Sequence, residues 1–207
     1  MDGGRSRRSF FSPSVQQAPG HPPPDDQPIK AGNFYLIRTR MERRTPTEGR
    51  TLVLNDRTGA LLFDLAEYVV AARSQANDLV IITPKRLARL NSMGKAIWEV
   101  PELRASTRFD EGIMFNVSGS DLIVLTYNAI ADSGVRVVRV HGADGGGVFA
   151  TECDGLGVPH SKYSQHVTAE ITKDRLVVLS HGSGGWFGET LDIASGKSTA
   201  RSSKIEW

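Results

Sequence analysis

Four turns, each closed by a glycine, recur along this 207-residue chain and constrain its fold more than any other feature. In each turn, an apolar residue and a polar turn residue precede the glycine, and a strand-like run follows it. The four segments are LNDRTGALLF (54–63), LNSMGKAIW (90–98), VHGADGGGVF (140–149) and LDIASGKSTA (191–200). Glycine adopts turn conformations that other residues avoid, so one strand ends and the next returns at such a corner. The sequence therefore predicts antiparallel hairpins repeated along the chain.

The spacing of these glycines indicates the size of the repeating unit. Gly59, Gly94, Gly145 and Gly196 are separated by 35, 51 and 51 residues. A four-stranded propeller blade needs about 40–45 residues on average, so each interval holds one blade. Phe63, Trp98, Phe149 and Ala200 stand four residues beyond the glycines. We expect a large side chain at this position to point at the neighbouring unit.

The clearest unit covers residues 68–100, where four short runs end at Asn-Asp, Pro or Gly. Such runs are typical of strands joined by turns. The predicted fold class is all-β, a β-propeller-like array of about four four-stranded antiparallel blades. The array is either a small closed ring or an open arc, and an open arc is expected to self-associate through its exposed edges. The predicted repeats are 33–66, 67–100, 107–152 and 165–205, and the first has no evident innermost strand before Asn33.

Residues 1–30 are rich in Pro, Gly, Ser and Arg and have little to bury, so they are predicted to form a disordered tail before one domain at 31–207. Within this tail, 6–11 resembles a twin-arginine export motif, but no apolar segment follows it. The predicted location is cytoplasmic, with export through this degenerate motif as the alternative. No run reaches the roughly 18 apolar residues of a membrane span.

Composition excludes several classes of function. The net charge of +2 is too small a bias to indicate nucleic acid, and the single cysteine, Cys153, leaves no internal disulfide. No Cys/His spacing of the zinc-finger type is present. We expect neither a metal nor a cofactor.

The turn pattern, approximately Asn/Asp-x-x-Thr/Ser-Gly-Lys-x-x-Trp, resembles the repeat of the quinoprotein-like (PQQ-type) β-propellers. LNSMGKAIWEV matches it best and LNDRTGALLF next, while the glycine-rich third turn and Ala200 depart from it. The resemblance covers about residues 33–205 and implies the propeller fold. That family includes both dehydrogenases and non-catalytic scaffolds, and the matching residues pack blades together, so the resemblance does not choose a function.

In a propeller of this kind, the loops between second and third strands and the links between blades lie on one face. Long loops are commonly functional, so we expect this face to bind a partner. The candidate binding residues are Arg43, Arg44, Lys85, Arg86, Tyr127, His181 and Trp186. The glycine-rich loop 181–186 lacks the following helix that a dinucleotide site requires, which favours a hairpin presenting Trp186.

Catalysis has less support in the sequence. No Gly-x-Ser-x-Gly elbow is present, and no base is identifiable for Cys153. A weak metal alternative consists of His160, His166 and His181. The sequence thus favours a non-enzymatic module that binds a protein partner. The alternatives are an enzyme or ligand binder related to quinoprotein or sugar-processing propellers, and a remnant of a longer propeller.

Overall fold

The structure is a computed structural model that describes residues 27–40, 49–101, 111–117, 119–127, 134–153, 166–182 and 185–205. These residues form sixteen strands in four separate four-stranded antiparallel sheets, which we number blades 1 to 4. Within the described residues no helix is long and apolar enough to cross a membrane. The predicted all-β class and the number of blades are confirmed.

Each blade is a meander in which neighbouring strands are consecutive in sequence. Blade 1 contains β1 (Ile29–Ala31), β2 (Phe34–Arg40), β3 (Gly49–Asn55) and β4 (Leu61–Leu65). Blade 2 contains β5 (Ala71–Gln75), β6 (Asp78–Ile82), β7 (Arg86–Leu90) and β8 (Ala96–Pro101). Blade 3 contains β9 (Glu111–Asn116), β10 (Leu122–Tyr127), β11 (Val135–Val140) and β12 (Gly147–Cys153). Blade 4 contains β13 (His166–Thr172), β14 (Arg175–Gly182), β15 (Gly185–Asp192) and β16 (Ser198–Ile205).

The first strand corrects one sequence prediction. The segment before Asn33 was expected to lack an innermost strand, but β1 pairs Ile29 with Leu36 and Ala31 with Phe34. The strand is only three residues long, and Lys30 within it breaks the apolar run. Its side chains are held by contacts with blade 2, which local sequence patterns do not reveal.

The four predicted corner glycines occupy equivalent turns between the third and fourth strands of the blades. Gly59, Gly94, Gly145 and Gly196 all have φ between 69° and 77°, a region that glycine adopts without steric cost. In the first turn, the Gly59 amide donates to the Asn55 carbonyl, 2.8 Å away, and the Asn55 side chain accepts from the amide of Thr58. Such side-chain bonds explain the recurring Asn or Asp before the glycine.

Three apolar cores lie between consecutive blades rather than within them. We call the face that packs on the next blade in sequence the forward face, and its opposite the receiving face. Leu36 and Val53 on the forward face of blade 1 pack with Leu79 and Leu90 on the receiving face of blade 2. The other two cores join blade 2 to blade 3 and blade 3 to blade 4 in the same way.

At the outer edge of each core, a large side chain of one blade covers the corner glycine of the next. A Cβ on Gly94 would lie 2.6 Å from Cγ of Phe63, and a Cβ on Gly145 would lie 2.8 Å from Cε3 of Trp98. Phe149 blocks Gly196 similarly. Since real Cβ atoms do not approach so closely, only glycine fits beneath these rings. The three aromatic rings therefore each contact the following blade.

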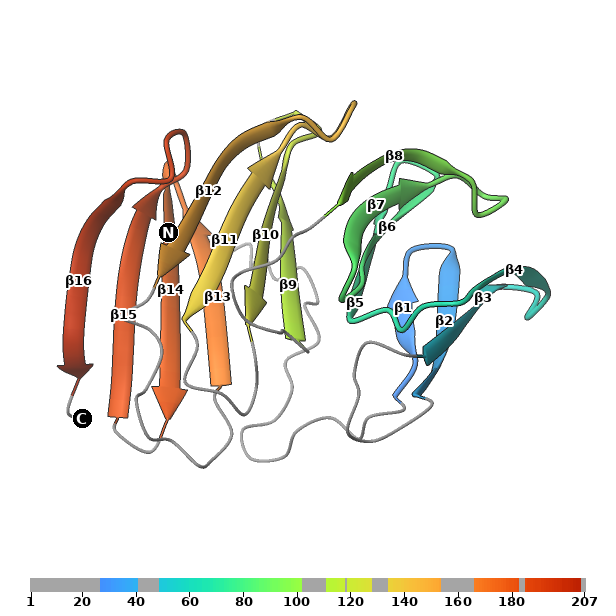
Figure 1. Ribbon diagram of the computed structural model, residues 1–207, viewed down its shortest axis with the longest axis horizontal. Helices are drawn as coiled ribbons and strands as arrows, with labels where there is room; N and C mark the ends of the chain where they lie inside the picture. Colours follow the sequence, from blue (N-terminus) through green and yellow to red (C-terminus); the bar gives the residue numbers. More distant parts are fainter. Residues whose placement is uncertain are drawn as a thin grey trace, which may run out of the picture.

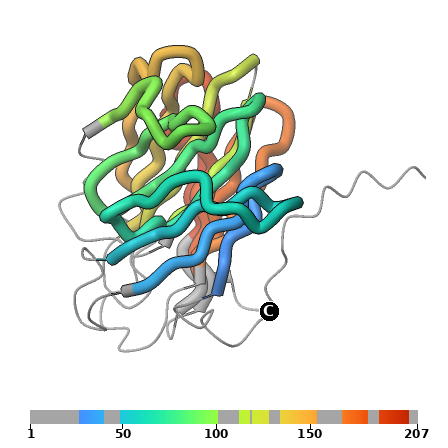
Figure 2. Tube along the Cα trace, turned by 90° about the vertical axis from the view of Figure 1, so that its right-hand side faces the viewer, coloured from blue at the N-terminus to red at the C-terminus, as the bar shows by residue number. Residues whose placement is uncertain are grey.

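The blades follow one another in an open arc. Blade 1 lies at one end of the row and blade 4 at the other (Figure 1). The turned view places blade 1 in front, with the later blades behind it (Figure 2). The innermost strands β1, β5 and β9 are neighbours along the arc. A Cβ on Gly59 would meet no atom within 4 Å, so no blade covers the first corner.

The core between blades 3 and 4 also holds polar groups. Cys153 is fully buried, and the Glu189 side chain beside it is only 1% exposed. Arg201 Nε lies 2.9 Å from Glu189 Oε1. Burial and the neighbouring Glu189 carboxylate raise the pKa of the Cys153 thiol to about 12, so the thiol is protonated at neutral pH.

We expect the Gly145→Ala variant to lose more stability than the Gly59→Ala variant. Both substitutions place alanine in the left-handed region, at a cost of about 1–2 kcal/mol. Only the alanine at 145 also collides with Trp98, which adds about 1–3 kcal/mol as overpacking does. Urea unfolding of the two variants measures the difference. Equal losses of stability would show that Trp98 does not pack closely against residue 145 of the next blade.

We expect Cys153 to be inert to a disulfide reagent such as DTNB in the native protein at pH 8. The reagent requires a thiolate, and burial both removes access and raises the thiol pKa. Labelling should therefore follow the rate of unfolding, whereas protein in concentrated urea should react at once. Rapid stoichiometric labelling of the native protein would contradict the described burial.

Candidate functional site

The two ends of the blades differ in the length of their connections. At one end the chain passes between strands in short turns, as from Gln75 to Asp78 and from Leu90 to Ala96. The connections at the other end include most of the long ones. They run from Arg40 to Gly49, Pro101 to Glu111, Tyr127 to Val135, and Cys153 to His166. We call this end the loop-rich face. Its described part includes residues 66–70 and 83–86.

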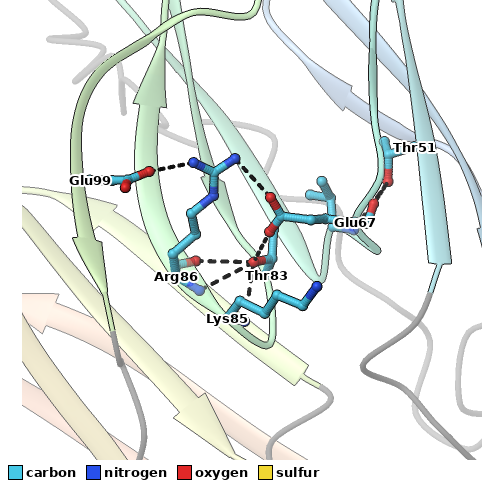
Figure 3. A network of polar contacts seen from close by, with 7 residues as sticks. Thr51, Glu67, Thr83, Lys85, Arg86 and Glu99 are labelled. Atoms are coloured by element: carbon cyan, nitrogen blue, oxygen red, sulfur yellow. Dashed lines mark hydrogen bonds and ion pairs between the residues drawn. The ribbon is translucent and has the colours of Figure 1, made fainter.

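A polar network at Glu67 and Arg86 organises this part of the face (Figure 3). Glu67 lies in the link between blades 1 and 2, and its Oε1 is 2.8 Å from Arg86 Nη2. The other carboxylate oxygen accepts a hydrogen bond from the Thr83 hydroxyl, 2.7 Å away. Arg86 also forms an ion pair with Glu99 on β8. The network fixes the start of β7 against the preceding link.

Thr83 and Thr51 connect this network to the backbone. The Thr83 hydroxyl oxygen accepts from the amides of Lys85 and Arg86, each 3.2 Å away. Thr51 on β3 donates its hydroxyl to the Glu67 carbonyl at 2.8 Å and accepts from the Val69 amide at 3.1 Å. The link between the first two blades is therefore held from both sides. Thr51 and Thr83 are fully buried, so these bonds are shielded from water.

The network separates the roles of the two predicted basic residues, Lys85 and Arg86. Burial of Arg86 alone lowers its pKa, but Glu99 and Glu67 outweigh this effect and the pKa is raised. Arg86 is therefore a structural cation with two carboxylate partners. Lys85 is exposed, and Figure 3 draws no interaction to its Nζ. Of the predicted pair Lys85 and Arg86, Lys85 is therefore the cation available to a partner.

Two further arginines, Arg38 on β2 and Arg50 on β3, are also engaged in contacts. Arg38 donates to the Gln27 carbonyl at 2.7 Å and lies 5.2 Å from the centre of the Tyr68 ring. This contact is a cation–π interaction that joins blade 1 to the link. Arg50 forms an ion pair with Asp64 on β4. The positive charge of these arginines is thus partly neutralised by Asp64 of the same blade.

The remaining predicted binding residues are only partly described. Arg43 and Arg44 lie outside the described residues. Tyr127 is the last residue of β10, where it is half-buried and packs against the core between blades 3 and 4. His181 and Trp186 lie opposite each other in the register of β14 and β15. The structure therefore does not gather the seven predicted residues into one described cluster.

The weak metal alternative is only partly described. His160 lies outside the described residues, whereas His166 and His181 are direct cross-strand partners in β13 and β14. No group of three His, Cys, Asp or Glu residues suited to a metal ion occurs among the residues that the structure describes.

Sequence reasoning missed Glu67 and Thr83 as organisers of this face. Glu67 stands beside Tyr68, Val69 and Val70 in the run AEYVV, all three of which are buried. An acid next to such a run was a signal that its carboxylate has a specific partner, because buried charge is costly when unpaired. The identity of that partner depends on Arg86, which is distant in sequence.

Comparisons with known proteins identify the fold. No protein-family model and no curated protein matches the chain. Among solved structures, a europium-containing methanol dehydrogenase has a TM-score of 0.56 at 10% identity, covering 84% of this chain and 40% of that one. Quinohemoprotein alcohol dehydrogenase from Comamonas testosteroni has a TM-score of 0.55 at 11% identity, with 84% and 34% covered. The Cps50 (Swd1) β-propeller domain from Myceliophteria thermophila has a TM-score of 0.52 at 10% identity, with 87% and 59% covered.

The chain spans roughly a third to three fifths of the length of these proteins. At such low identity the likeness concerns the fold, and the neighbours include both dehydrogenases and a β-propeller domain. The match agrees with the turn pattern, the four meanders and the stacking of their faces. The chain therefore consists of β-propeller blades, in a fold similar to that of the Cps50 (Swd1) β-propeller domain and of the two dehydrogenases.

Proposed function

We propose that this protein is a non-enzymatic β-propeller module that binds a protein partner through its loop-rich face. The observation that carries the proposal is the gathering of the long connections at one end of the blades, while tight turns dominate the other. A rigid scaffold that holds long loops together is a common arrangement for binding surfaces. The connections from β2 to β3 and from β10 to β11 are longer than a hairpin requires, because two residues can join neighbouring antiparallel strands.

The polar network supports the proposal by making the base of this face rigid. Thr51, Thr83 and Glu67 fix the backbone around the link and the β6–β7 turn. Lys85 projects from this fixed turn with an exposed side chain. Presenting a cation on a rigid turn reduces the ordering cost of binding. The partner surface that fits is acidic, since charge complementarity steers association.

We expect the triple variant Arg43→Glu, Arg44→Glu, Lys85→Glu to lose partners that the wild-type protein retains. Arg86 is left intact because it holds Glu67 and Glu99. Pull-downs of the tagged protein from its own cells, quantified by mass spectrometry, should show at least a tenfold loss of a specific partner.

The matched control for this experiment is Lys95→Glu, which reverses an exposed charge in the turn before β8, at the opposite end of blade 2. This variant should retain the partner. A triple variant that captures the same proteins as the wild type would rule out the basic loops as the contact.

A second candidate is a metal or small-ligand site in blade 4, supported by the register that places His166 opposite His181. A ligand that binds only the folded protein raises its melting temperature by mass action. Metal analysis of the purified protein, with thermal shifts in calcium, zinc and a quinone, tests this candidate. Stoichiometric metal or a saturable shift that His181→Ala removes would favour it over the protein-binding module. A metal-free protein with no shift would remove it.

A further inference from the structure

Two blade faces have no neighbour within the described structure. They are the receiving face of blade 1 and the forward face of blade 4, at opposite ends of the arc (Figure 1). Every other blade face contributes to one of the three apolar cores. The two free faces are therefore the places where the stacking pattern is incomplete.

The receiving face of blade 1 combines an apolar patch with Lys30, Arg50 and Asp64, which the register places on the same face. Directly opposed residues in antiparallel strands share a face, and the register groups Tyr35 with Leu54 and Leu61, and Ile37 with Leu52. Leu61 is 59% exposed and Ile37 is 40% exposed. The corresponding apolar residues of blade 2, such as Leu79 and Leu90, are completely buried. Blade 1 thus presents to solvent a surface that the other blades cover.

The forward face of blade 4 differs from the forward faces that hold a neighbour. Blade 2 uses Trp98 and Arg89, which both donate to the Gly142 carbonyl of blade 3, at 3.0 Å and 2.7 Å. Blade 3 uses Phe149 over Gly196 and Arg139, whose guanidinium donates to the Ile193 carbonyl at 2.7 Å. The equivalent residues of blade 4 are Ala200 and Thr190, which are themselves cross-strand partners.

The inner strands of blade 4, β13 and β14, leave space on this face. A hollow there is lined by Thr168, Glu170, Val177 and Leu179 together with Ala169. Val177 and Leu179 are partly exposed, so the floor of the hollow is apolar. The rim carries threonine and glutamate side chains. A bulky apolar group from another molecule would fit such a surface.

Blade 1 has a large residue at a position where each of the other three blades has a small one. The residue two places after each corner glycine pairs with the last part of the third strand, and it is Ala96, Gly147 and Ser198 in blades 2 to 4. In blade 1 it is Leu61. Internal junctions therefore join a large forward residue to a small receiving one. At the two free faces the sizes are reversed. The forward residue, Ala200, is small, and the receiving residue, Leu61, is large.

From this exchange of sizes we infer that the receiving face of blade 1 docks on the forward face of blade 4 of a second copy of the chain. Two such junctions, related by a two-fold axis, close two four-bladed arcs into one ring. Eight blades lie within the range of four to eight that propellers adopt. The junction continues the stacking of the internal blades, with Leu61 supplying the volume that Ala200 lacks.

Other arrangements of two copies use these surfaces less well. Two receiving faces would oppose Leu61 of one copy to the equally bulky face of the other and would leave both blade 4 hollows empty. Two forward faces would pair the polar rims and leave both apolar patches in water. Only the junction between unlike faces covers both the apolar residues of blade 1 and the hollow of blade 4. The inference is independent of any partner bound at the loop-rich face.

The test uses introduced cysteines, because buried Cys153 gives little background reaction. The double variant Leu61→Cys, Ala200→Cys is treated with a short bis-maleimide, and the products are separated by mass. We expect a covalent dimer of twice 22.5 kDa, and a dimer of the untreated protein in analytical ultracentrifugation. Both sites are exposed in the single chain, so circular dichroism should show that folding is unchanged.

Each single variant and a displaced pair serve as controls. Leu61→Cys alone and Ala200→Cys alone should stay uncrosslinked, as should Met93→Cys with Ala200→Cys, because Met93 is exposed on blade 2, away from the free faces. Leu61→Asp should dissociate the dimer, whereas Met93→Asp should not.

Four results would overturn the inference. A dimer linked by Leu61→Cys alone would mean that like faces meet. A link within one chain would mean that four blades close by themselves. A ladder of larger products would indicate an open filament, which unlike faces form when their rotation does not close. A wild-type protein that remains monomeric at high concentration would exclude any such ring.

Discussion

The contact between a large side chain and the corner glycine of the next blade is the constraint on which this structure depends. A blade alone is a four-stranded sheet and cannot bury the apolar residues on its faces. The ring of Trp98 reaches Gly145 only because that residue has no Cβ, and Phe63 and Phe149 use Gly94 and Gly196 in the same way. Each such contact brings a forward face onto a receiving face and so closes one apolar core.

Polar contacts add direction to this stacking. Arg89 and Arg139 each hold an aspartate of their own blade, Asp78 and Asp121, and donate across the junction to a turn carbonyl of the next blade. These bonds satisfy carbonyl groups at the edge of the core. Because they run only from one blade to the following one, the array has a defined direction and two unlike ends.

The loop-rich face and the free ends follow from the same architecture. Stacking meanders in one direction places equivalent connections side by side, so the long ones collect at one end of the array. Stacking also leaves the first receiving face and the last forward face without a neighbour. Binding through the loops and association through the free faces therefore use separate surfaces.

The sequence by itself determined the repeating blade and its corners. Turn chemistry and the alternation of apolar residues are local properties, so Gly94, Trp98 and the meander around them were predictable from neighbouring residues. The three-residue strand β1 was missed because it is too short to show a pattern. The tertiary structure alone decided that Arg86 is paired by Glu67 and Glu99 and that blade 1 keeps a bare face. These outcomes depend on contacts between distant segments, which local sequence does not encode.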